Sequence, residues 1–267
     1  MHRDSLWLGP AKKLFRNAAV VFGTLTALIY AYLIFGQFAF EDPIGMYEMI
    51  RPAGRPIVAA MLLCILGTFL CSSIYFSDTK GAIETEPHGF FDVLSLVASR
   101  MAMIMTAFIV VVMFYEVVSR YVFASPTLWA NELSLWLAAF VFLFAGQYAM
   151  QQRSHIRIYV IYDVMPRWAQ KTSDIISTVL IVFFAFAMIW GGYNDAATRF
   201  MRMETFGTAW DPPIPGVVKP AILFIIALVA VQAVSNLISD WNKTPEHIGH
   251  DDIDEVDIEN IRKTLER

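Results

Sequence analysis

The sequence of residues 101–150 is MAMIMTAFIVVVMFYEVVSRYVFASPTLWANELSLWLAAFVFLFAGQYAM. It contains two long apolar runs, 101–119 and 129–150, which are separated by a short, more polar segment. An α-helix needs about 20 mostly apolar residues to cross the roughly 30 Å of hydrocarbon in a bilayer. Both runs meet this requirement, so residues 101–150 predict a helical hairpin that crosses a membrane twice.

Four further apolar runs lie on either side of this hairpin. The six runs predict spans at about residues 18–38, 56–76, 101–119, 129–150, 173–194 and 217–239. The composition agrees, because 57% of the residues are hydrophobic and 16% are charged, whereas a soluble domain carries about 25% charged residues. We therefore expect an all-α, polytopic membrane protein with six transmembrane helices. A net charge of −4 without a basic face argues against nucleic-acid binding.

The cationic residues predict how the chain is oriented. With the N-terminus inside, 14 lysines and arginines fall on the inner side and 6 on the outer side. Cytoplasmic flanks are usually enriched in these residues, so both termini are expected in the cytoplasm. The first run follows Lys12 and Lys13 as a signal peptide would, but it exceeds the usual 7 to 15 apolar residues and is expected to stay uncleaved.

Three segments fall outside the predicted spans. Residues 89–100 are apolar but contain Asp92 and Ser95, so they fit either a helix lying in the membrane interface or an extension of the third span. Residues 195–216 form a long predicted outer loop that ends in several prolines, which stop helices. The tail, 241–267, is acidic and is expected to be cytoplasmic, and a short helix is plausible within it.

The spans lack the groups on which membrane enzymes and carriers depend. Ionisable residues fall near the predicted helix ends, and all five histidines lie outside the spans, so no haem ligand pair is available. Hydrolase, P-loop and metalloprotease motifs are absent. We therefore expect no catalytic residue, no cofactor and no metal site. The alternatives are an anchor subunit of a respiratory or redox complex and an independent channel or small carrier.

The segment between the two spans of the quoted hairpin has its own polar pattern. Glu116 and Arg120 are four residues apart on one helix face. Arg120 has three possible partners, which are Glu116, Glu132 and a lipid phosphate. Ser125 and Pro126 have the character of a cap and first-turn proline for the next helix, and Trp129 suits an interfacial anchor. These residues form a candidate lock on the hairpin.

The stretch from Glu116 to Pro166 also carries a family resemblance. It contains R-Y-V-F at 120–123, W-A-N-E-L at 129–133 and H-I-R-I at 155–158, followed by Pro166. This ordered set resembles the small membrane subunit of tripartite ATP-independent periplasmic (TRAP) transporters, the DctQ-type family, over residues 95–240. The resemblance implies two protein partners, a large permease subunit and a periplasmic substrate-binding protein, in addition to membrane lipids. It also implies sodium-coupled uptake of an organic acid across the inner membrane of a bacterial or archaeal cell.

Candidate interface residues follow from the motif and from the loops. Those of the subunit interface or hairpin lock are Glu116, Arg120, Tyr121, Trp129, Glu132, His155 and Arg157, and those of a periplasmic docking loop are Arg199, Arg202 and Glu204. The family usually has four helices, so we divide the chain into an N-terminal segment with two additional spans (1–88), a four-helix core (89–240) and the tail (241–267). The family often has an acid near Tyr159, where this chain has none.

Overall fold

The computed structural model of the protein describes residues 5–40, 43–79, 89–153 and 165–241, together with Gly81, Glu84 and Pro87. The helices in this part of the chain are α1 (Ala11–Ala39), η1 (Glu48–Ile50), α2 (Pro56–Ser77), α3 (Phe90–Tyr121), α4 (Ala130–Gln151), α6 (Arg167–Met201) and α7 (Ile214–Asp240). Six of them are long and apolar enough to cross a membrane. The predicted all-α fold with six spans is therefore confirmed.

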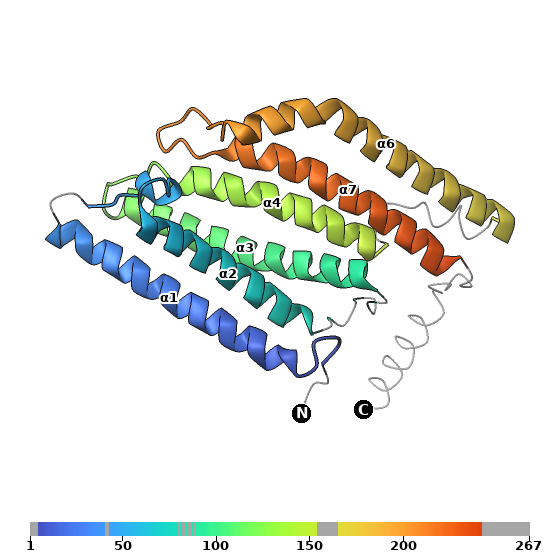
Figure 1. Cartoon of the computed structure of the whole chain (residues 1–267), viewed down its shortest axis with the longest axis horizontal. Coiled ribbons are helices and arrows are strands. Elements are labelled where there is room, and N and C mark those ends of the chain that lie inside the picture. Colours follow the sequence, from blue (N-terminus) through green and yellow to red (C-terminus); the bar gives the residue numbers. More distant parts are fainter. Residues whose placement is uncertain are drawn as a thin grey trace, which may run out of the picture.

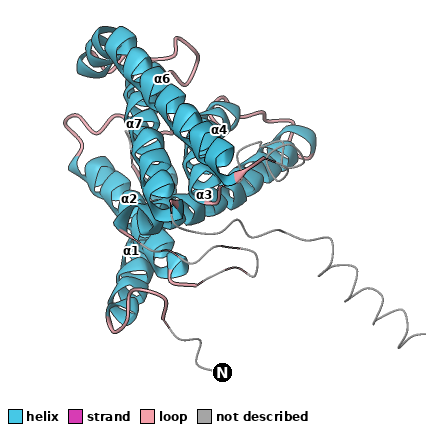
Figure 2. Cartoon of the chain, turned by 90° about the vertical axis from the view of Figure 1, so that its right-hand side faces the viewer, coloured by secondary structure: helices cyan, strands magenta, loops and turns pink. Residues whose placement is uncertain are grey.

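The six long helices lie side by side in a curved row (Figures 1 and 2). Their order is α1, α2, α3, α4, α7 and α6, and each helix packs mainly against its neighbours in that order. Ser5 and Trp241 lie at one end, which we call the terminal end. The opposite end, which we call the far end, carries the connections at 43–55, 122–129 and 202–213.

Several helices are longer than their apolar runs. Helix α3 begins at Phe90, so residues 90–100 are its first turns, and the structure has the extension of the third span rather than a separate interfacial helix. Helix α6 covers 167–201 instead of the predicted 173–194, which shortens the predicted 195–216 loop. Hydrophobicity marks the part of a helix that crosses hydrocarbon, whereas the backbone hydrogen bonds continue into the polar interface.

Two expected helix starts also need correction. Helix α4 begins at Ala130 with Trp129 as its N-cap residue, so Ser125 and Pro126 lie in the preceding turn and do not cap the helix. Helix α7 begins at Ile214, and Pro215 occupies its first turn. Proline is accepted there because the first-turn N–H groups have no partner within the helix, so only the earlier prolines of that run lie outside the helix.

The row has little apolar core but a continuous buried polar cluster. In the most apolar stretch of each helix, only 6% to 22% of the residues are buried. Among the buried ones, Gln147 of α4 donates to the Ser95 hydroxyl of α3 at 2.9 Å, and that hydroxyl donates to Gln232 of α7 at 3.3 Å. The Gln232 amide donates to Asp92 and Asn236 at 2.7 and 2.9 Å. Hydrogen bonds therefore tie α3, α4 and α7 together.

A second polar contact fixes the start of the chain at the terminal end. Asp78, just after α2, is buried and accepts hydrogen bonds from the backbone N–H groups of Trp7 and Leu8 at 2.9 and 3.0 Å. The Ser5 hydroxyl and the Lys12 ammonium both lie 2.9 Å from the same carboxylate. Burial raises the pKa of Asp78, but these four donors outweigh it and lower the pKa to about 2. The carboxylate is therefore ionised at neutral pH and holds the N-terminal segment against α2.

We expect Gln232→Leu to destabilise the protein, because it removes the hydrogen bonds of the Gln232 amide with Ser95, Asp92 and Asn236. Hydrogen bonds between membrane helices contribute about 0.6 to 1.7 kcal/mol each, so a loss of about 1 to 3 kcal/mol is expected for this triple contact. Unfolding in mixed micelles measures it. Ser239→Ala, an exposed site on the same helix, is the control. Equal stability of the two variants would contradict the role given to the cluster.

Candidate functional site

The turn between α3 and α4 brings three polar side chains together at the far end. Glu116 is almost fully buried, with its side chain 5% exposed. One of its oxygens accepts from Arg120 Nε at 2.9 Å and Nη2 at 2.5 Å. The other accepts from the backbone N–H of Thr127 at 3.0 Å and from the Thr127 hydroxyl. Glu116 therefore ties the end of α3 to the segment that leads into α4.

Of the three partners considered for Arg120, the structure shows Glu116. Glu132 lies in the first turn of α4, as expected, but it does not pair with Arg120. Its carboxylate instead accepts a hydrogen bond from the Thr208 hydroxyl at 2.6 Å, so it joins α4 to the α6–α7 connection. The Arg120 side chain is 50% exposed while it pairs with Glu116.

The other motif residues have different surroundings. Tyr121 is 79% exposed at the end of α3. Trp129 is half-buried and stacks on the Tyr115 ring, with 5.8 Å between the ring centroids. His155 and Arg157 lie outside the described residues. The structure therefore brings Glu116, Arg120 and Trp129 to one turn and leaves Tyr121 pointing away from the protein.

Two of the three predicted docking-loop residues pair with each other. Arg199 lies in the last turn of α6, not in a loop, and pairs with Glu204 and with Asp195, the latter at 2.8 Å. Lys219 of α7 also binds Asp195, at 2.5 Å. Arg202 is exposed and has no ion-pair partner among the described residues. These contacts fix the junction of α6 and α7 and leave Arg202 available at the surface.

Sequence reasoning missed a contact between the first and the last connection of the far end, 43–55 and 202–213, which are far apart in the sequence. Arg51, which precedes α2, donates to the backbone carbonyls of Trp210 and Asp211, with the shortest distance at 2.8 Å to Asp211. In return, the Trp210 indole N–H donates to the Met46 carbonyl at 2.8 Å. The guanidinium also stacks over the Tyr47 ring, 3.5 Å from its centroid. The only feature of the sequence that pointed to this contact was a cation, Arg51, on the predicted outer side.

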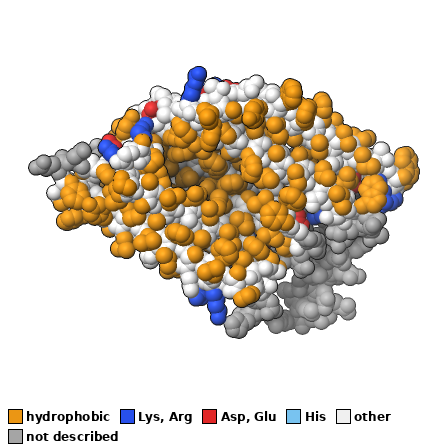
Figure 3. All heavy atoms as spheres, viewed as in Figure 1, with side chains coloured by type: hydrophobic (Ala, Val, Ile, Leu, Met, Phe, Trp, Pro, Cys, Tyr) orange, Lys and Arg blue, Asp and Glu red, His pale blue; other side chains and the backbone are white. Residues whose placement is uncertain are grey.

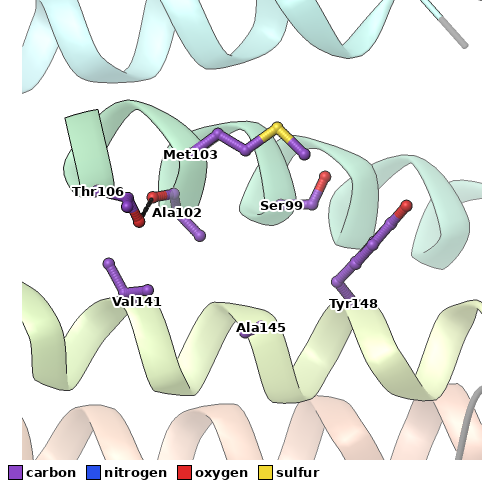
Figure 4. Close-up of a pocket in the computed structure, with 7 residues that line it drawn as sticks. All are labelled: Ser99, Ala102, Met103, Thr106, Val141, Ala145 and Tyr148. Atoms are coloured by element: carbon purple, nitrogen blue, oxygen red, sulfur yellow. Dashed lines mark hydrogen bonds between the residues drawn. The ribbon is translucent and has the colours of Figure 1, made fainter. Parts of the chain in front are cut away.

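A groove of about 380 Å³ lies between α3 and α4 nearer the terminal end (Figure 4). Its lining residues are mostly apolar, and the two hydroxyls from α3 bond to their own helix: Ser99 to Leu96 at 2.8 Å and Thr106 to Ala102 at 2.8 Å. A ligand site needs convergent polar groups as well as apolar walls. Ser99 and Thr106 do not converge on the groove, and the Tyr148 hydroxyl, which also lines it, donates to Glu84 at 2.8 Å, so all three hydroxyls are engaged within the protein.

A carboxylate from the α2–α3 connection lies next to this groove. Glu84 accepts from Arg100 at 2.7 and 2.6 Å and from the Tyr148 hydroxyl at 2.8 Å. Burial raises the pKa of Glu84, but Arg100, the Gly81 N–H and Tyr148 lower it to about 2. No group of three or more metal-ligating side chains occurs in the described part of the chain. The charged groups of this region, Glu84 and Arg100, therefore bond to each other within the protein.

We expect Glu116→Gln and Thr127→Val to be energetically coupled, because both remove the same contact. The coupling energy should be about 0.5 to 2 kcal/mol, between an exposed and a partly buried polar contact. A double-mutant cycle on unfolding in mixed micelles measures it. As the control, Arg120→Gln and Glu132→Gln should have additive effects. Coupling of the control pair, with additivity of the first pair, would show that the turn is held differently.

Comparison with known proteins places these features in a family. Residues 109–243 match the model of the family described as tripartite ATP-independent periplasmic transporters, DctQ component. The chain is also 24% identical over 153 residues to the sialic acid TRAP transporter permease protein SiaT of Haemophilus influenzae (strain 86-028NP). The matched region covers 48% of this chain and 25% of that protein. The chain thus spans about a quarter of this curated relative. No solved structure matches it. Because the family model covers half of the chain, including α4, α6, α7 and the second part of α3, this protein belongs to the DctQ component family of TRAP transporters.

Proposed function

We propose that this TRAP transporter component is a scaffold subunit. In this proposal it binds a large permease subunit within the membrane, and the large subunit contains the substrate and sodium sites. A soluble periplasmic protein brings the substrate, an organic acid, to the far end of the row. Both termini lie in the cytoplasm and the spans lie in the inner membrane.

The observation that carries this proposal is the single-layer arrangement of the helices. A self-sufficient carrier binds its substrate near the middle of the membrane, usually between broken helices of two repeats. Here the buried polar side chains Ser95, Gln147 and Gln232 bond to one another across α3, α4 and α7. The row leaves its two broad faces to lipid and to partner proteins. This arrangement supports a role in assembly and not in conduction.

The surface of the row supports the same proposal. One broad face is almost entirely apolar, and its few charged side chains lie at the margins (Figure 3). Helices α1 and α6 end the row, and only 6% of the residues in their most apolar stretches are buried. Apolar faces of this extent mark contacts with the membrane or with another protein. We infer that the large permease subunit covers part of this surface and widens the transporter in the bilayer.

The far end is the proposed docking face for the periplasmic binding protein. Its three connections are joined through Glu132 and Thr208 and through Arg51 and the 202–213 segment. Exposed side chains of mixed character, including Arg202 and Met203, lie on this segment. A connected surface with apolar and charged groups is suited to a soluble partner.

We expect the isolated chain in liposomes to transport no organic acid and to bind none at micromolar concentration in calorimetry. Liposomes that also contain the large subunit, supplied with the binding protein and a sodium gradient, should accumulate substrate. Omission of this chain should abolish the uptake. Uptake by this chain alone would identify an independent carrier, and a haem absorption spectrum would identify a redox anchor; either result would overturn the proposal.

The proposed orientation has its own test. Reporters fused near Glu48, Ser125 and Arg202 should report the periplasm, whereas reporters near Lys80, near Arg157 and after Arg267 should report the cytoplasm. The physical basis is the excess of cations on the terminal side. A reversed result at any of these positions would refute the six-span topology with cytoplasmic termini.

A further inference from the structure

We propose that Arg51 and Trp210 are positioning residues, which hold the 202–213 segment in the shape that receives the periplasmic binding protein. The inference rests on the docking role proposed above and extends it to the two N-terminal helices. Helices α1 and α2 lie outside the region matched by the family. In this proposal they serve the docking face, because the connection between them supplies Arg51.

The contact is suited to holding a segment that has little regular structure. Residues 202–213 lie between α6 and α7, so their carbonyls lack the regular partners of a helix. Arg51 reaches two of these carbonyls, those of Trp210 and Asp211, and its guanidinium also lies 3.6 Å from the Asp211 carboxylate. A planar guanidinium can donate to several acceptors at once in a fixed geometry, which a lysine cannot reproduce.

Burial makes the contact specific. Trp210 is 3% exposed, and its indole N–H donates to the Met46 carbonyl. Each connection therefore supplies a donor to the backbone of the other: Arg51 to the 202–213 segment and Trp210 to the 43–55 segment. Removal of either side chain leaves carbonyl groups without their donor in a partly buried place, which is costly.

The rest of the 202–213 segment is held from the family part of the chain. Thr208 is tied to Glu132 of α4, and the Gly216 N–H donates to the Glu204 carbonyl at 3.1 Å. Asp211 has a left-handed backbone (φ +55°), and its side chain accepts from the Gly207 N–H at 2.7 Å. These contacts shape the segment locally. Arg51 and Trp210 add the link to the N-terminal hairpin, while Arg202, Met203 and Phe206 remain exposed.

The first experiment tests whether the contact holds the segment. Hydrogen exchange of the full chain in detergent should be faster at residues 202–213 in Arg51→Ala than in the wild type, on the order of tenfold, as expected when charge-assisted hydrogen bonds are lost. Arg55→Ala is the matched control. It removes the same charge from the same connection, and Arg55 pairs with Glu48 and not with this segment. Equal exchange in the two variants would overturn the proposal.

The second experiment tests docking in the assembled transporter. Liposomes containing both membrane subunits are supplied with increasing amounts of the substrate-loaded binding protein that is encoded with them. Arg51→Ala and Trp210→Phe should each raise the half-saturating concentration of binding protein on the order of tenfold, with the maximal rate unchanged. Arg51→Lys should not restore the wild-type value, whereas Arg55→Ala should retain it.

The outcomes separate this inference from the proposed function. A half-saturating concentration unchanged by Arg51→Ala overturns the positioning role but leaves docking intact. A lower maximal rate, or loss of the large subunit on purification, would assign the contact to assembly and also overturn the positioning role. If wild-type transport does not depend on the binding protein at all, the docking function itself fails, and this inference fails with it.

Discussion

Polar groups that a protein buries away from water need hydrogen-bond partners within it, because a buried polar group without a partner is costly. In this chain that constraint selects which helices are held together. The Ser95, Gln147 and Gln232 side chains form one hydrogen-bonded cluster, and their helices are α3, α4 and α7. Apolar packing alone is weak in a bilayer, because lipid tails are as apolar as the side chains. The polar cluster therefore provides the specific contact in the centre of the row, around which the other helices are arranged.

The same requirement operates at the helix ends, where three carboxylates each bond to several donors. Asp78 binds the N-terminal segment, Glu84 binds Arg100 and Tyr148, and Glu116 binds Arg120 and Thr127. Each therefore connects a helix to a segment that would otherwise be held only by chain connectivity. At the far end, Arg51 makes a similar polar contact, which joins the first connection to the last one. The N-terminal hairpin is thus attached to the family core by helix packing and by a polar contact near the membrane surface.

A row of this kind favours a protein that works in a complex. One broad face carries mainly apolar side chains (Figure 3), the buried Ser95, Gln147 and Gln232 side chains bond to one another, and the connected loops lie at one end. These properties suit a subunit that holds others in position. The groove between α3 and α4 agrees with this view, because the Ser99 and Thr106 hydroxyls bond to their own helix and the Tyr148 hydroxyl bonds to Glu84. Chemical selectivity needs polar groups that remain free to meet a ligand.

The sequence by itself determined the six spans, the all-α class and the family resemblance, because these depend on local features such as the length of an apolar run and the order of short motifs. It also placed Arg120 four residues after Glu116, so that their pairing was among the expected contacts. It did not determine the full lengths of α3 and α6, since backbone hydrogen bonding continues past the hydrophobic boundary. Only the tertiary structure decided that Glu132 meets Thr208 and that Arg51 meets Trp210, residues far apart in the chain. Such contacts depend on which helices are neighbours in the row, and a local sequence pattern does not show the side-chain contacts that decide this, such as that of Ser95 with Gln232.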